Sequence, residues 1–293
     1  MKCSLNKYFA LSIWCLQLLY GGLSLAQKSE DNTFKLIISS SMFQNVKTED
    51  VYASTKILAS ELKKDMKSNE QYEIIVCSSI DEILERIKTP FDVMYLSPIE
   101  YLKLKKKFDL EPALISDIDN NYGDIYYLIT NKNENVKSII DLKNSTINIL
   151  SNADEQPPTI WLDKLLRENK LPAKHKFFKQ VNLDYKTNNV VLPVYFKKTG
   201  AAIVTKSGFE LICELNPHIK EEIIVIHKSN PMMRAIFCFD GRNNDAERKR
   251  FLSDYLQKLH ASNHGKQILN LYMVKRIIPY KAEYIESILD LYK

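Results

Sequence analysis

The sequence predicts an α/β fold made of two lobes with largely parallel sheets. Short apolar runs alternate with amphipathic segments along most of the chain, which is the pattern of strands followed by covering helices. The chain has 293 residues, 45% of them hydrophobic, so it can bury one large core or two medium ones, and we favour two. We find no internal repeat at a fixed period.

The first lobe opens on an apolar strand followed by a polar loop and a long helix. Thr48 is a suitable N-cap for this helix, and Pro98 suits the first position of a later one. In chain order we expect strand 34–39, helix 49–66, strand 72–77, helix 79–88, strand 91–96 and helix 98–107, followed by a strand pair over 111–116 and 124–130 that leads away from this lobe.

The second lobe continues the alternation, and the chain then returns to the first lobe. We expect strand 146–150, helix 157–169, strand 177–181, helix 187–197, strand 201–204 and helix 206–215, two returning apolar runs at 223–226 and 235–239, and closing helices over 244–261, 264–272 and 281–291. Two crossings would place hinge strands side by side and form a cleft at the strand ends of both lobes. The predicted boundaries are 27–125 and 229–293 for the first lobe and 126–228 for the second.

Residues 1–26 are predicted to be a cleavable export signal. Lys2 and Lys7 precede an apolar run that is too short to span a membrane, and Ser24-Leu25-Ala26 supplies the small residues of a cleavage site. An uncleaved N-terminal anchor is the alternative. We therefore expect a periplasmic or otherwise extracytoplasmic protein that is secreted as a soluble mature chain.

Charge and cysteine usage narrow the function further. The net charge of +5 includes Lys2 and Lys7, so the mature chain carries a small, diffuse excess that gives no reason to expect nucleic-acid binding. Removal of the signal leaves three cysteines in apolar contexts, where buried, unreactive thiols are common. A disulfide between two of them is the alternative. These are Cys77, Cys213 and Cys238.

Common catalytic and cofactor motifs are missing. Only seven glycines occur, and neither Gly-x-Gly-x-x-Gly nor Gly-x-x-x-x-Gly-Lys is present, so no phosphate-cradling loop is predicted. His260 and His264 have metal-ligand spacing, but no carboxylate completes a site and surface histidines are the better interpretation. We expect no cofactor and no metal.

Residues 91–102 read FDVMYLSPIEYL and resemble a segment of the phosphonate-binding family of periplasmic solute-binding proteins. Asp141-Leu142-Lys143 and Ser229-Asn230-Pro231 support the resemblance, which covers nearly the whole mature chain in element order. It implies a two-lobed type 2 periplasmic-binding-protein fold with two crossover hinge strands. Members of this family deliver a small, often anionic solute to an ABC transporter by closing the lobes around it.

The sequence departs from this family where the anion would sit. Family members carry a Ser-Thr-Ser-Gly-like loop before the second-lobe helix, whereas residues 151–159 read SNADEQPPT. Two carboxylates would repel a doubly charged anion, and two prolines remove N–H donors. The acid of the family's later Gly-x-x-Asp-Ala segment is absent from residues 197–201, and its upstream histidine has no counterpart at 185–188. A ligand of different chemistry is therefore implied.

The candidate ligand-binding residues are hydroxyl-bearing or acidic side chains placed near strand ends, hinges and loops. Tyrosine offers a small ligand both a ring face and a hydroxyl, and serine or threonine can orient it. The predicted set is Ser41, Tyr95, Ser97, Tyr101, Tyr126, Asp154, Glu155, Thr159 and Tyr185. As partners we expect a small-molecule ligand and an ABC permease or another membrane protein, with the chain itself a monomer.

Two alternatives keep the same fold. A stand-alone sensor or accessory protein that docks on a membrane partner would account for the altered anion loop. An enzyme using Asp154 or Glu155 as acid or base ranks last, because no positioned nucleophile accompanies the two carboxylates.

Overall fold

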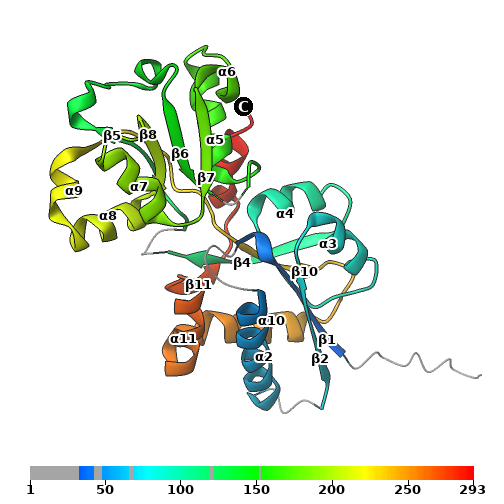
Figure 1. The fold of residues 1–293 in the computed structure, drawn as a ribbon. Helices are drawn as coiled ribbons and strands as arrows, with labels where there is room; N and C mark the ends of the chain where they lie inside the picture. Colours follow the sequence, from blue (N-terminus) through cyan, green and yellow to red (C-terminus); the bar gives the residue numbers. More distant parts are fainter. Residues whose placement is uncertain (1–32, 43–47, 66–68, 119–121, 152) are drawn as a thin grey trace, which may run out of the picture. The chain divides into compact units, whose positions relative to one another are not determined.

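Two β-sheets organise the computed structural model, which describes residues 33–42, 48–65, 69–118, 122–151 and 153–293 (Figure 1). Apart from Thr33, these residues belong to one unit, Phe34–Lys293. The predicted export signal over residues 1–26 lies outside the described residues. None of the described helices is both long and apolar enough to cross a membrane.

The first sheet has six strands in the order β11-β4-β10-β3-β1-β2. Strand β1 is parallel to β3, whereas β10 runs antiparallel between β3 and β4. The strands are β1 (Thr33–Ser39), β2 (Gln71–Cys77), β3 (Val93–Leu96), β4 (Leu110–Asp117), β10 (Ile236–Asp240) and β11 (Arg276–Pro279). The accompanying helices are α2 (Thr48–Asp65), α3 (Ile80–Arg86), α4 (Pro98–Leu104), α10 (Ala246–Lys258) and α11 (Asn263–Leu271), with the short η1 (Ser40–Met42) and η4 (Leu259–Ala261).

The second sheet has five strands in the order β7-β6-β8-β5-β9. Strand β6 is parallel to β7 and β8, and β5 is antiparallel to β8 and β9. The strands are β5 (Tyr126–Asn131), β6 (Thr146–Leu150), β7 (Gln180–Asp184), β8 (Ala201–Thr205) and β9 (Ile223–Lys228). The helices are α5 (Pro157–Glu168), α6 (Lys174–Phe177), α7 (Thr187–Tyr195), α8 (Lys206–Leu215) and α9 (Pro217–Glu222), with the short η2 (Lys132–Glu134) and η3 (Ile139–Leu142).

The second sheet is buried on both faces. Successive side chains of a strand point to opposite faces, and β8 follows this rule. Ala201 and Ile203 join the core that contains Trp161 of α5, whereas Ala202 and Val204 join the core formed with α7 and α8. Figure 1 shows the same arrangement, with α5 and α7 on opposite sides of the strands. Continuous apolar runs are the signature of such doubly covered strands.

Two segments cross between the sheets side by side. Asp124, before β5, and Met232, before β10, form an antiparallel bridge with N–H···O distances of 2.8 Å in both directions. A Cβ added to Gly123 would lie 1.9 Å from the carbonyl oxygen of Met232, so only glycine permits this approach. These are the two predicted crossover hinge strands.

The end of the chain contacts the second-sheet helix α5. After β11 follow η5 (Ala282–Ile285) and α12 (Glu286–Asp290). Lys164 of α5 forms an ion pair with Asp290, and the Nη2 of Arg167 donates to the carbonyl of Leu291 at 3.0 Å. The boundaries 27–125, 126–228 and 229–293 stay a proposal, with these contacts joining the last segment to the second lobe.

Most predicted elements are present within a few residues of their expected ends. One strand is displaced by three residues: it was predicted at 177–181, whereas residues 174–177 form α6 and strand β7 begins at Gln180. Phe177 ends the helical turn and is fully buried, so its apolar character serves a helix rather than a strand. The edge strand β11 and the short helix α9 were not predicted from the sequence.

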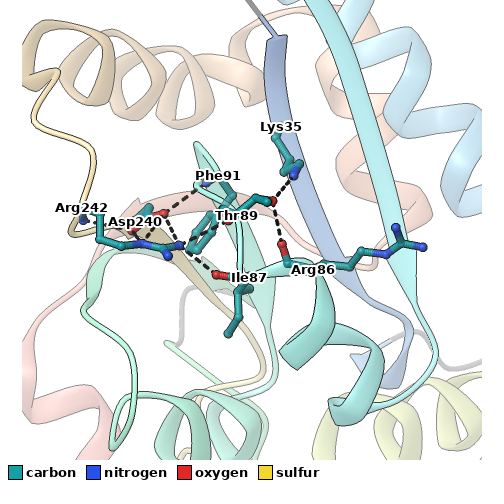
Figure 2. Close-up of polar contacts among 7 residues, drawn as sticks. All are labelled: Lys35, Arg86, Ile87, Thr89, Phe91, Asp240 and Arg242. Atoms are coloured by element: carbon teal, nitrogen blue, oxygen red, sulfur yellow. Dashed lines mark hydrogen bonds and ion pairs between the residues drawn. The ribbon is translucent and has the colours of Figure 1, made fainter. Parts of the chain in front are cut away.

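A polar network fixes the end of β10 that lies away from the crossings (Figure 2). Asp240 accepts hydrogen bonds from the Nε and Nη2 of Arg242, at 2.8 Å and 2.7 Å, and from the backbone N–H of Phe91 at 3.1 Å. Arg242 in turn donates to the carbonyl oxygens of Ile87, at 2.9 Å, and Thr89, at 3.3 Å. The network therefore ties β10 to the loop between α3 and β3.

Cys77, Cys213 and Cys238, the cysteines among the described residues, are free and buried, which confirms the prediction of buried thiols. Burial raises the pKa of all three, that of Cys77 to about 11. They are therefore protonated and unreactive at neutral pH.

Candidate ligand-binding cleft

A cavity of about 520 Å³ is lined by residues from both sheets and from the crossing segments. Its volume falls in the range of small-molecule sites, roughly 300–1,000 Å³. The polar residues that line it are Ser41, Ser97, Asp124, Tyr126, Gln156, Tyr185, Thr187, Thr205, Ser207, Arg234, Asn270, Tyr272 and Lys275.

The first sheet contributes two serine hydroxyls that are joined through one carboxylate. Ser97 caps α4 and donates from its Oγ to Oε2 of Glu100 at 2.8 Å. The other oxygen of Glu100 accepts from Ser39 at 2.7 Å, and Ser39 is 2.9 Å from the hydroxyl of Ser41. Because these groups hold one another, Ser41 and Ser97 keep fixed positions at the cleft wall.

The second sheet contributes hydroxyls at the starts of α7 and α8. Thr205 caps α8 by accepting from the backbone N–H of Gly208 at 3.2 Å. A Cβ on Gly208 would lie 2.9 Å from the Thr205 Oγ1 and 3.2 Å from Thr187, so the absent side chain lets the two helix starts approach each other. Ser207 lies beside them in the same wall.

A buried ion pair lies at the crossings. The Nε and Nη2 of Arg234 donate to the two carboxylate oxygens of Asp124 at 2.8 Å and 2.6 Å. Burial alone would lower the pKa of Arg234, but the adjacent Asp124 outweighs it and keeps the guanidinium charged. The charges of Arg234 and Asp124 cancel. Among the described residues that line the cleft, the exposed Lys275 is therefore the remaining charged side chain.

Tyr126 brings a buried hydroxyl to the cleft. Its side chain is 5% exposed, and its Oη makes no hydrogen bond to the described residues. Burial, followed by the nearby Asp124, raises the pKa of the phenol, so it stays a neutral donor. A buried hydroxyl without a partner in a cavity wall is a group that a ligand can satisfy.

The structure places four of the nine predicted site residues in this cavity: Ser41, Ser97, Tyr126 and Tyr185. Of the others, Tyr95 hydrogen-bonds to Ser116 at 2.8 Å, stacks on Phe237 and faces the helices of the first lobe, and burial raises its pKa to about 12. Tyr101 is packed in the main core, and burial raises its pKa to about 12 as well. These two rings lie outside the cleft lining.

The remaining three predicted residues belong to the loop and first turn of α5. Asp154 is exposed and lies 3.4 Å from the Nζ of Lys174, and the exposed Glu155 pairs with Lys103 of α4. Thr159 is fully buried and donates to the carbonyl of Gln156 at 2.8 Å. None of the three lines the cavity.

The first turn of α5 has no free N–H group to offer an anion. Pro157 and Pro158 occupy its first two positions and have no N–H. The N–H of Thr159 is already bonded to the carbonyl of Gln156 at 3.1 Å. A helix start binds anions through such N–H groups, so α5 lacks the means to do so.

Several cleft residues were not predicted from the sequence, among them Asp124, Thr205, Ser207, Arg234 and Lys275. Thr205 ends the buried strand β8 and Ser207 lies in the first turn of the helix that follows, a position at a strand end from which the sequence could have predicted them. The Asp124–Arg234 pair joins residues that are 110 positions apart, which no local pattern reveals.

No cluster of three or more metal-binding side chains occurs among the described residues. His260 contacts the carbonyl of Gln257 at 2.7 Å, and His264 lies 3.7 Å from Glu61. The two histidines therefore lie beside different residues, Gln257 and Glu61.

Two α/β lobes, two crossover strands and a polar cavity between the sheets define a binding protein of the two-lobed type 2 periplasmic class. The chain belongs to the phosphonate family of these proteins, the periplasmic substrate-binding proteins of ABC transporters, whose pattern matches residues 41–284. The resemblance noted in the sequence is thereby confirmed. Members of this family are substrate-binding components of transporters.

Solved structures share the fold at low identity. The phosphonate-transporter binding protein of Pseudomonas aeruginosa is 16% identical, with a TM-score of 0.60 over 89% of this chain and 85% of its own. PhnD1 of Prochlorococcus marinus, in complex with methylphosphonate, is 15% identical, with a TM-score of 0.60 over 89% and 97%. A Xanthomonas citri protein bound to ATP is 13% identical, with a TM-score of 0.62 over 89% and 95%. No curated protein matches the sequence.

Proposed function

We propose that this chain is an extracytoplasmic solute-binding protein that captures a small molecule in the cleft, with the family's anion loop replaced. Residues 1–26 would direct its export. The observation that carries the proposal is one cavity lined by hydroxyls of both sheets, including that of Tyr126, which has no hydrogen-bond partner among the described residues. A ligand held by both walls favours the closed arrangement, because it gains contacts there that neither wall provides alone.

The closed start of α5 supports a ligand other than a phosphonate at that loop. Its first three positions present no free N–H, and Asp154 and Glu155 precede them. A dianion there would meet two carboxylates and no backbone donor from the first turn of α5. Ser41, Ser97, Tyr126 and Tyr185, joined by Thr205 and Ser207, are the residues we propose for the ligand.

As partners we propose the small ligand and a membrane permease of the ABC class, with the chain acting as a monomer and binding no nucleic acid. The closed α5 start also favours the alternative role of a sensor or accessory protein that docks on a membrane partner. Catalysis by Asp154 or Glu155 has less support, because both acids are exposed and paired with lysines.

The proposal can be tested with two neighbouring tyrosines of β5. Tyr126 lines the cleft, whereas Tyr127 packs on the opposite face against Phe209. A panel of phosphonates, sulfonates, amino acids and sugars, together with a small-molecule cell extract, is screened by thermal shift on the mature chain. For any solute that raises the melting temperature, Tyr126→Phe should weaken binding by about threefold to tenfold.

Tyr127→Phe is the matched control, since it removes the same atom from the other side of the strand and should leave affinity unchanged. Equal binding by both variants would contradict the cleft assignment. A complete absence of thermal shifts, combined with specific capture of the chain by a membrane protein that is not a permease, would favour the accessory role.

A further inference from the structure

A second cavity lies inside the first lobe, between one face of its sheet and the helices α2, α10 and α11 (Figure 1). Its volume is about 80 Å³. Alternate residues of β1 form its floor, and the helices supply apolar side chains opposite them. Representative lining residues are Leu36, Ile38, Ala59, Leu256 and Leu269.

The hydroxyls around this cavity are already engaged with one another. Tyr95 and Ser116 are 2.8 Å apart. The Oη of Tyr272 lies 3.1 Å from the Oγ1 of Thr55, which itself donates to the carbonyl of Val51 at 2.7 Å. A buried water needs two to four polar partners, and these groups have little bonding capacity left. The chemistry of the cavity therefore suits an apolar occupant.

The cavity and the cleft share a wall. Tyr272 and Val274 line both of them, in the segment that joins α11 to β11. Between these two residues, Met273 has a φ of 50°, a left-handed conformation that is strained for a residue with a side chain. Its carbonyl accepts from the Nη1 of Arg234 at 3.0 Å. A single turn, held by one cleft residue, thus separates the polar site from the apolar one.

We propose that the ligand is an amphiphile, whose polar head lies in the cleft and whose short apolar tail passes Tyr272 and Val274 into this second cavity. The proposal rests on the cleft being the solute site. An apolar cavity of about 150 Å³ holds benzene, so about 80 Å³ corresponds to a tail of roughly three or four carbons. The head is a small group that hydroxyls and one lysine can bind.

The experiment uses two homologous series, the singly charged n-alkylsulfonates and the n-alkyl alcohols, with tails from methyl to hexyl. Affinities for the mature chain are measured by isothermal titration calorimetry. Each buried methylene should raise affinity by about fourfold, and the gain should stop near the fourth carbon, where the cavity is full.

Ala59→Leu fills the cavity from α2, where Ala59 is 5% exposed. Ala53→Leu makes the same change on the exposed side of the same helix and is the matched control. The gain with tail length should disappear in Ala59→Leu and persist in Ala53→Leu. The smaller Ala59→Val, which should remove part of the gain, serves if Ala59→Leu does not fold.

The same length dependence in the Ala59 and Ala53 variants, or no dependence on length in the native chain, would overturn the tail site. Its failure can be told apart from failure of the cleft by adding Tyr126→Phe. A length-dependent gain, combined with equal affinities of the native chain and Tyr126→Phe for every member, would support the cavity and contradict the cleft. Weaker binding of every member by Tyr126→Phe, without any effect of tail length, would support the cleft and overturn the tail site.

Discussion

Two arginine–aspartate pairs flank strand β10, and they share one geometry but differ in place. Arg234–Asp124 and Arg242–Asp240 are both bidentate, with N···O distances between 2.6 Å and 2.8 Å. The first joins the two crossing segments and lines the cleft. The second lies at the other end of the strand, within the first lobe (Figure 2).

The two pairs differ in how far their side chains are exposed to solvent. The side chains of Arg234 and Asp124 are 19% and 7% exposed, whereas Arg242 is 41% exposed above a fully buried Asp240. Water therefore reaches the arginine of the second pair more readily than the arginine of the first. The cost of breaking a pair rises with the burial of the charge left behind. Arg234→Met leaves the buried Asp124, whereas Asp240→Asn leaves the more exposed Arg242, so the first change should cost more.

The largest effect is expected from Arg234→Met. This change leaves Asp124 buried and unpaired and removes the donor to the carbonyl of Met273, so the free energy of unfolding should fall by about 4 kcal/mol in urea titrations. Adding Asp124→Leu should restore part of the loss, because the unpaired charge is then gone. If the free energy of unfolding of Arg234→Met lay within about 1 kcal/mol of the native value, the hinge pair would contribute little to stability.

A smaller, pH-dependent effect is expected from Asp240→Asn. Burial raises the pKa of the Asp240 carboxyl, but hydrogen bonds from Arg242 and from the backbone N–H of Phe91 outweigh it and hold the pKa below its usual range. In the unfolded chain this carboxyl has a pKa near 3.9, and in the folded protein its pKa is lower. The ionised carboxylate therefore stabilises the fold at pH values above about 3.9, and this stabilisation is lost as the pH falls through the folded pKa. Asp240→Asn should therefore cost about 3 kcal/mol at pH 7 and less below about pH 4.

Unfolding titrations from pH 7 to pH 3 measure this difference. A gap between native chain and variant that stays constant over the range would contradict the lowered pKa. Ligand affinity separates the two pairs further: Arg234→Met should change it, whereas Asp240→Asn, at the far end of β10, should not.

Features that depend on a local pattern were predicted from the sequence, whereas contacts between distant residues, such as Arg234 and Asp124, were not. The alternation of apolar runs and amphipathic helices is local, and it predicted the two sheets and the crossings correctly. The strand predicted at 177–181 begins three residues too early, because a helical turn buries Phe177 as well as a strand would. Strand β11 has only four residues, and its pairing with β4 comes from the fold rather than from its own pattern.

The candidate site shows the same limit. Ser97 follows β3 directly and Ser41 lies two residues beyond the end of β1, so the strand pattern alone brings them to the cleft. Tyr95 shows how strand periodicity decides direction: it shares a face of β3 with Val93, towards the helices, while Met94 and Leu96 join the main core. Arg234 was missed because its role depends on a carboxylate 110 residues away.

The smallest effect is expected at an exposed pair, Lys103–Glu155, which joins α4 to the loop before α5. Its side chains are 48% and 75% exposed, so solvent screens the attraction. Glu155→Gln should change the free energy of unfolding by less than about 0.5 kcal/mol, and less still in high salt. Lys88–Glu85, a similarly exposed pair within the first lobe, supplies the control variant Glu85→Gln.

The same variants test the sequence-based prediction that Glu155 contacts the ligand. Direct contact would appear as a loss of affinity in Glu155→Gln without a loss of stability, and Glu85→Gln would show neither.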